Sequence, residues 1–114
     1  MKQRARRIAE MIQREIGQII NFEMRDPRMK NLTITGVQLS DDLGYAKIYY
    51  VTAGTDAELK QIKETLVHAQ GFLRTKIGER IDMKYVPQIK FFFDESIAHS
   101  ARMDELFKEI KTGE

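Results

Sequence analysis

The chain has 114 residues, enough for one domain with a modest core and too few for two. Hydrophobic residues make up 42% of the sequence and charged residues 32%, as in ordinary globular proteins, and no apolar run could cross a bilayer or act as a signal peptide. The absence of cysteine excludes disulfides, thiolate catalysis and cysteine metal sites, and we expect a cytoplasmic protein.

The net charge of +2 is unevenly distributed along the chain. Residues 1–30 have a net charge of +4, residues 31–66 of −2, residues 67–93 of +3 and residues 94–114 of −3. If the two positive blocks lie side by side in the fold, they form one basic patch. Such a patch favours a polyanionic partner more strongly than the total charge does.

The first predicted element is an amphipathic helix over residues 4–22. Its apolar stripe consists of Ile8, Ile12, Ile16, Ile19 and Ile20. Lys2, Arg4, Arg6 and Arg7 crowd its N-terminal end, where the helix dipole disfavours cations. Either an external anion stabilises these cations, or the residues form a frayed, solvated helix end. Pro27, within the turn Asp26-Pro27-Arg28, prevents the helix from continuing.

Two strands are predicted next. The apolar alternation of residues 32–39 changes phase across Gly36, which predicts a strand with a bulge. A turn over residues 40–44 leads to a second strand at residues 45–51. We therefore expect an antiparallel hairpin.

A longer helix is predicted over residues 55–81. Thr55 and Glu58 have capping-box spacing, and an apolar stripe of Leu59, Ile62, Leu66, Ala69, Leu73 and Ile77 follows. Gly71 is unfavourable in a helix interior and follows a small residue, so we expect two helices meeting at a kink over Ala69-Gln70-Gly71.

A kink of this kind has two interpretations. Backbone N–H groups near residues 71–73 would lack partners and attract phosphate, with Arg74, Lys76 and Arg80 adding positive charge. Alternatively, Gly71 only allows a neighbouring element to pack closely, and the basic residues form a solvated face.

The remaining elements are a third strand at residues 88–93 and a last helix at about 96–111. The order α-β-β-α-β-α predicts an α+β fold in which helices cover one face of a three-stranded sheet. Ala46, Ile48, Tyr50, Ile89, Phe91 and Phe93 should face the helices, and Tyr45, Lys47, Tyr49, Lys90 and Phe92 should face outward. The outward set either contacts RNA or forms ordinary cross-strand pairs on a wet surface.

Several segments together resemble the bacterial ribosome-binding factor A family, over residues 6–107. They are the turn at Asp26–Arg28, the segments SDDLGYAKIYYV and GFLRTKIGERI, the kink at Ala69–Gly71 and the segment FFFDES. The kink matches the alanine-x-glycine of that family. As in the family, the sequence contains no GxxG, the loop by which an ordinary KH domain clamps a short single strand.

The resemblance implies a type II KH-like domain over residues 1–114 and a monomeric, non-catalytic assembly factor without cofactors. Such a factor binds the small (30S) ribosomal subunit and its 16S rRNA, near the neck and the 5′-terminal helix, during late maturation. Members are associated with growth in the cold, and some act with a ribosome-associated GTPase. The candidate RNA-binding residues are Arg4, Arg6, Arg7, Ala69, Gln70, Gly71, Arg74, Lys76, Arg80 and Lys84.

Two other functional classes remain open on the sequence alone. An enzyme has little support, because His68 and His99 are the only histidines and no metal-spaced cluster or nucleophile motif occurs. His68 could donate to a phosphate when protonated, or be an ordinary solvated residue. The remaining class is a small protein-interaction adaptor that does not bind RNA directly and uses the third strand or last helix.

Overall fold

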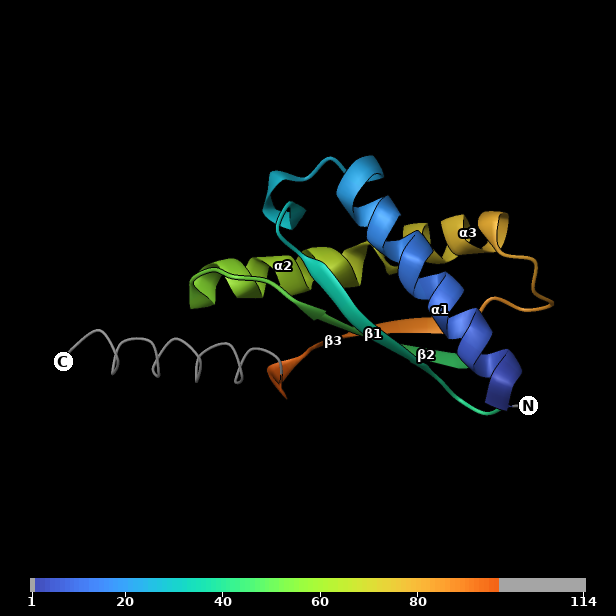
Figure 1. Cartoon of the computed structure of the whole chain (residues 1–114). Coiled ribbons are helices and arrows are strands. Elements are labelled where there is room, and N and C mark those ends of the chain that lie inside the picture. Colours follow the sequence, from blue (N-terminus) through green and yellow to red (C-terminus); the bar gives the residue numbers. More distant parts are fainter. Residues whose placement is uncertain (1, 97–114) are drawn as a thin grey trace.

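The computed structural model describes residues 2–96, and the predicted last helix therefore lies outside the described residues apart from its first position. The described elements are α1 (Lys2–Gln18), a π-helical turn (Ile19–Glu23), a 3₁₀ turn (Pro27–Met29), β1 (Thr33–Leu39), β2 (Tyr45–Val51), α2 (Asp56–His68), α3 (Gln70–Arg80) and β3 (Gln88–Phe93). Figure 1 shows their arrangement. Their order confirms the predicted α+β succession as far as β3.

The sheet has the strand order β1-β2-β3. β1 and β2 pair antiparallel, which confirms the predicted hairpin, whereas β2 and β3 pair parallel. The register of β1 shifts between Ile34, opposite Tyr50, and Gly36, opposite Tyr49. Thr35 is therefore the extra residue of the predicted bulge, and its hydroxyl donates to Asp94 Oδ2 at 2.7 Å, next to the end of β3.

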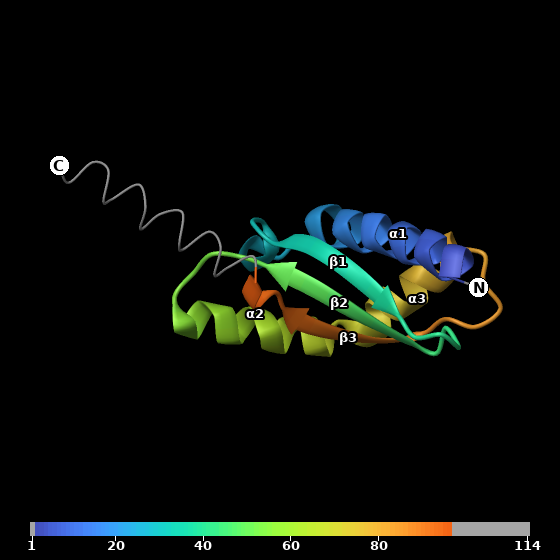
Figure 2. The ribbon, with the colours of Figure 1, turned by 60° about the horizontal axis from the view of Figure 1, so that its bottom comes forward.

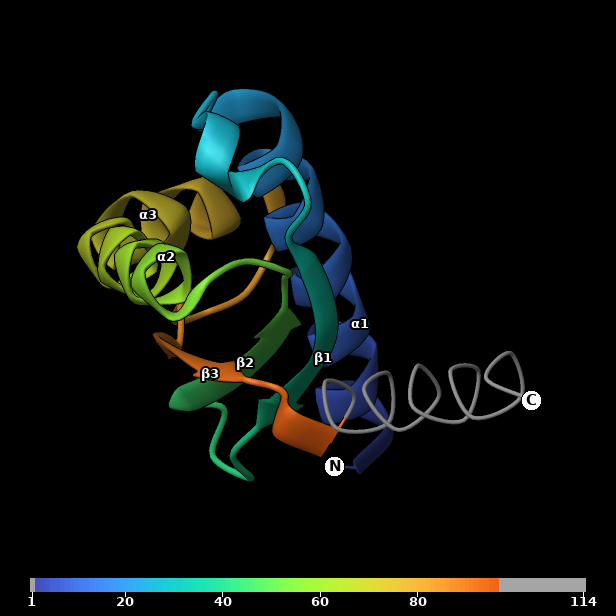
Figure 3. The same ribbon diagram turned by 90° about the vertical axis from the view of Figure 1, so that its left-hand side faces the viewer.

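One core lies between the sheet and the helices. Figure 3 shows α1 beside β1, and α2 and α3 contact β3. The predicted stripes supply the core: Ile12 and Ile16 of α1, Ile62 and Leu66 of α2, and Leu73 and Ile77 of α3 are all buried. They meet Ile48, Tyr50, Ile89 and Phe91 from the sheet. Periodicity thus identified the buried face of each helix correctly.

The end of the first helix differs from the prediction of a regular helix to residue 22. The last five residues, Ile19–Glu23, form a π-helical turn, and both Ile19 and Ile20 are buried. A π-helical turn accommodates an extra residue without breaking the helix. It therefore lets two consecutive isoleucines face the core. Arg25 then takes a positive φ of 52° and turns the chain away from the helix.

Candidate nucleic-acid interface

The predicted kink is present, and it divides the predicted long helix into two. α2 ends at His68, α3 begins at Gln70, and Ala69 caps both. At the start of α2, Thr55 and Glu58 form the predicted capping box: Glu58 N–H donates to Thr55 Oγ1 at 3.2 Å and Thr55 N–H to Glu58 Oε1 at 3.1 Å. α2 is therefore capped at its entry by side chains.

The start of α3 has no comparable cap, because no side chain accepts from its first amides. The N–H of Leu73 donates to the Ala69 carbonyl at 2.9 Å, so the expectation that this amide would be free is wrong. This is the first hydrogen bond of the α3 ladder, and three amides precede it in the helix. The amides of residues 70–72 form the N-terminal turn of α3, where no carbonyl of α3 itself can accept from them, and this end of the helix could face an anion.

Gly71 does not serve close packing. It is exposed, and a Cβ added to it would meet nothing within 4 Å, which argues against the packing interpretation of this residue. The glycine at which the chain does pack closely is Gly78, where a Cβ would lie 2.9 Å from Val86 Cγ2. The absence of a side chain at Gly71 instead leaves the start of α3 open to a ligand.

A groove runs between α2 and the edge strand β3 beside the kink. It encloses about 580 Å³, and its walls include Lys63, Val67 and Gln70 from the helices and Lys90 and Phe92 from β3. Val67 is 51% exposed and Phe92 40% exposed. Of these residues, the sequence placed Gln70 among the candidate RNA-binding residues and left an RNA contact open for Lys90 and Phe92. The groove depends on β3 lying parallel to β2 beside α2, which local patterns do not reveal.

Arg74 and Arg80 are engaged within the fold. Arg74 Nε donates to the Pro87 carbonyl at 3.2 Å and its Nη2 to the Val86 carbonyl at 2.9 Å. Arg80 Nη1 donates to Glu15 Oε2 at 3.1 Å, and the same guanidinium pairs with Glu23. The hydrogen bond to Glu15 raises the pKa of Arg80 above its ordinary value. These arginines join α3 to the segment before β3 and to the first helix.

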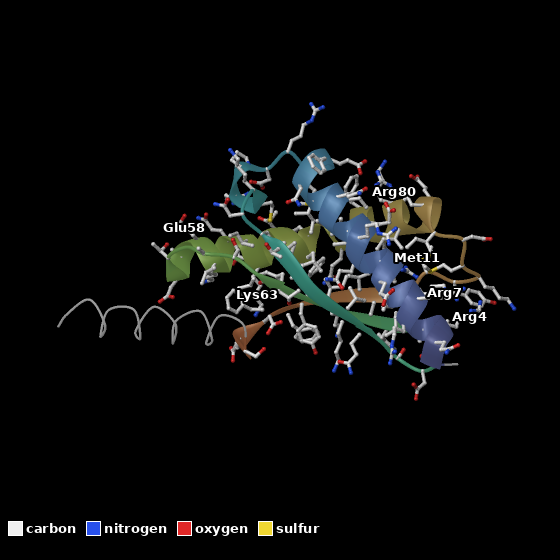
Figure 4. The ribbon with its side chains drawn as sticks, in the orientation of Figure 1. Arg4, Arg7, Met11, Glu58, Lys63 and Arg80 are labelled. Atoms are coloured by element: carbon white, nitrogen blue, oxygen red, sulfur yellow. The ribbon has the colours of Figure 1, made fainter. Side chains whose placement is uncertain are left out.

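A basic corner lies at the other end of α3. Arg4 of α1 and Lys84 of the segment before β3 line one hollow of about 380 Å³, together with apolar side chains such as Ile8 and Val86. Figure 4 shows Arg4 and Arg7 on the N-terminal part of α1, away from Arg80. Arg4, Arg6 and Arg7 are exposed. We call Arg4, Arg6, Arg7 and Lys84 the basic corner.

The structure therefore groups the ten predicted residues into three sets. Arg4 and Lys84 line one hollow, as the charge blocks of the sequence suggested, and Arg6 and Arg7 are exposed on the same helix as Arg4. Ala69, Gln70 and Gly71 lie at the kink, near the groove. Lys76 lies on α3 with its ammonium 5.7 Å from the Phe72 ring and 3.8 Å from Glu79, whereas Arg74 and Arg80 are occupied by protein partners. The ten residues do not form one continuous surface of free cations.

The catalytic alternatives gain no support from the described residues. Within residues 2–96, no three acidic, histidine or cysteine side chains are grouped as metal ligands. His68 is exposed and its Nδ1 lies 2.7 Å from the Glu64 carbonyl, an acceptor, so this nitrogen donates within its own helix. Within the same residues, no helix combines the length and apolar character needed to cross a membrane.

The fold and the site define a class of protein: a type II KH-like α+β domain whose helices meet at a kink. The family model for ribosome-binding factor A matches residues 4–107. The chain belongs to the ribosome-binding factor A family. A ribosome-binding factor A from Halothermothrix orenii is 42% identical over 113 residues, which cover 99% of this chain and 93% of that protein.

Solved structures agree with this assignment at the level of the fold. The crystal structure of ribosome-binding factor A from Thermus thermophilus matches with a TM-score of 0.69 and 22% identity, covering 77% of this chain and 93% of that one. A Thermus thermophilus homology model fitted into the cryo-EM map of a complex with the 30S subunit matches with a TM-score of 0.65, again at 22% identity, covering 76% and 91%.

Proposed function

We propose that the chain is a non-catalytic ribosome assembly factor that binds the small ribosomal subunit and contacts its 16S rRNA during late maturation. Membership of the ribosome-binding factor A family is the observation that carries this proposal. The related Thermus thermophilus protein, fitted into a map of its 30S complex, supports the choice of subunit. The proposed site of action is the neck and 5′-terminal helix region, in the cytoplasm and as a monomer.

The mode of binding follows from the two surfaces described above. The basic corner supplies phosphate contacts, and the groove beside the kink offers the uncapped start of α3 to a phosphate while Gly71 leaves room for its approach. Neither surface requires a GxxG loop, and folded RNA is recognised through its backbone and shape. A ribosome-associated GTPase that promotes release, and a role in growth in the cold, belong to the same proposal.

The basic corner can be tested with charge-matched variants. We expect Arg4→Ala/Lys84→Ala to weaken binding to purified small subunits and to reduce the slope of log K against log salt by about 2, since each lost phosphate contact removes about 1. Arg14→Ala/Lys60→Ala removes the same charge from exposed positions on α1 and α2, and should bind as the wild type does. Sedimentation with subunits at several salt concentrations measures both.

The outcomes of these experiments test the location of the interface and the proposed function separately. If the Arg4/Lys84 variant binds like the wild type, the basic corner is not the interface. If the wild-type chain fails to bind small subunits, or associates with a protein partner without salt dependence and without affinity for RNA, the adaptor function replaces the proposed one. Crosslinking to immature and mature subunits, with the 16S rRNA contacts mapped, tests the location.

A further inference from the structure

The face of the sheet opposite the helices shares only its β3 edge, at Lys90 and Phe92, with the groove beside the kink. Figure 2 shows this face, with the strands in front of α2 and α3. Its outward residues are those predicted from the alternation of the strands: Tyr45, Lys47 and Phe92 are exposed, Lys90 is exposed and Tyr49 is half-buried. None of the three strands contains an acidic residue. The face is therefore both aromatic and positively charged.

The two lysines of this face are direct neighbours. Lys47 of β2 and Lys90 of β3 are register partners in the parallel pair. Like charges at neighbouring positions on one sheet face destabilise the sheet, and an ordinary wet surface would pair them with carboxylates. Within residues 2–96 the ion pairs involve other cations, and neither lysine has such a partner. An anionic ligand would relieve their mutual repulsion.

The aromatic side chains lie beside the lysines, at the next outward positions along β2 and β3. The rings of Tyr49 and Phe92 have centroids 5.9 Å apart at an interplanar angle of 35°, and the Lys47 ammonium lies 5.9 Å from the Phe92 ring centroid. Tyr45 is 58% exposed and Phe92 40% exposed. Exposed rings next to cations provide the stacking surface and the phosphate contacts that a single-stranded nucleic acid needs.

The sheet face is continuous with the groove beside the kink. Lys90 and Phe92 belong to the outward face of β3 and also line the groove between β3 and α2. A strand of RNA that occupies the groove could therefore pass over the edge of β3 onto the aromatic face. A duplex could not follow this path with its bases against the rings, since its bases are already stacked with each other.

We propose that this face of the sheet is a second RNA contact, which binds an unpaired stretch of rRNA by stacking its bases on Tyr45, Tyr49 and Phe92. Lys47 and Lys90 would contact its phosphates. The inference rests on the proposed function, since it names the kind of RNA that the chain recognises on the subunit. It adds single-strand binding to the backbone contacts of the basic corner.

A labelled 12-nucleotide oligouridylate tests the face directly in a fluorescence anisotropy titration. We expect Lys47→Gln/Lys90→Gln to weaken its binding and to reduce the salt slope by about 1.4, the value for two phosphate contacts to a single strand. Phe92→Leu should weaken binding about tenfold through lost stacking. Lys30→Gln/Lys60→Gln, which removes two exposed lysines elsewhere, should bind as the wild type does.

A second measurement separates binding from folding. The Lys47/Lys90 variant should unfold in urea at a midpoint no lower than the wild type, because it removes a like-charge pair. A 12-base-pair RNA duplex should not displace the oligouridylate. Equal binding of wild type and both sheet variants to the oligouridylate, or efficient displacement by the duplex, would overturn the proposal.

The binding assay with small subunits distinguishes a failure of the sheet proposal from a failure of the proposed function. If the Lys47/Lys90 variant binds subunits less tightly and this loss disappears at high salt, the second contact is supported. If subunit binding depends on the basic corner and not on the sheet variants, the sheet proposal fails while the proposed function stands. If the wild type binds the oligouridylate but not the subunits, the proposed function fails while the sheet contact stands.

Discussion

Arg74 shows that a single residue can have partners within the fold that the sequence alone does not reveal. Its charge and its place one turn after the kink made it a candidate for RNA, yet both hydrogen bonds found for its guanidinium go to carbonyls of Val86 and Pro87. Arg80 similarly pairs with Glu15 and Glu23, which are 65 and 57 positions away. Residue type predicted the charge of these positions correctly, but no local pattern reveals partners so distant in sequence.

We expect Arg74→Met to lower the free energy of unfolding by about 1 to 3 kcal/mol, because it removes a charged donor from two carbonyls in a half-buried position. The matched change Arg14→Met, at an exposed position of α1, should change it by less than about 0.5 kcal/mol. Urea unfolding followed by circular dichroism measures both. Equal stability of the two variants would show that the Arg74 contacts contribute nothing to the fold.

At the scale of the element, the sequence was most informative where the signal is local. Apolar stripes identified the buried face of each described helix, the Thr55–Glu58 spacing identified the cap of α2, and Gly71 identified the kink. The π-helical turn at Ile19–Glu23 was missed, because two adjacent isoleucines are compatible with an ordinary helix. The helix widens there because both isoleucines are buried in the core, and this packing is visible only in the structure.

Gly71 allows the structural and functional roles of the kink to be separated. Replacing it with alanine should raise the free energy of unfolding by up to about 1 kcal/mol, since alanine favours a helix and its Cβ meets nothing within 4 Å. The same methyl group would stand at the open start of α3 and should weaken binding to small subunits. Urea unfolding and subunit sedimentation give the two values.

Gly17→Ala is the matched control for this experiment. Gly17 lies in α1, and a Cβ there would also meet nothing within 4 Å. We expect the same gain in stability with unchanged subunit binding. If Gly71→Ala behaves like Gly17→Ala in both measurements, the start of α3 does not contact the ribosome.

At the scale of the whole molecule, the strand order and the parallel pairing of β2 with β3 were beyond the sequence. These features depend on contacts between segments about 40 positions apart, for which periodicity carries no information. They also determine the proposed RNA surfaces, because they bring Lys90 beside Lys47 and create the groove along α2. The correctly predicted elements therefore indicated which residues lie on the surface, but not which of them are neighbours in the fold.

The pH dependence of stability depends on titratable side chains in several parts of the fold. The side-chain hydrogen bond from Arg28 holds the pKa of Asp26 below its ordinary value of 3.8, and the Ser40 hydroxyl does the same for Asp42. The Thr55 amide holds the pKa of Glu58 below 4.5. Burial raises the pKa of Tyr50 above 10.0.

The directions of these pKa shifts predict that the stability of the fold is constant over a middle range of pH and falls at both low and high pH. A carboxylate with a lowered pKa stabilises the fold above its ordinary pKa and loses that contribution as the pH falls, so stability should decline below about pH 4. The neutral Tyr50 stabilises the fold below its ordinary pKa, so stability should also decline above about pH 10. Urea midpoints measured from pH 2 to 11 test both limbs. Glu58→Gln should make the acid limb shallower, and a midpoint that stays constant down to pH 2 would contradict the assignment of these three carboxylates.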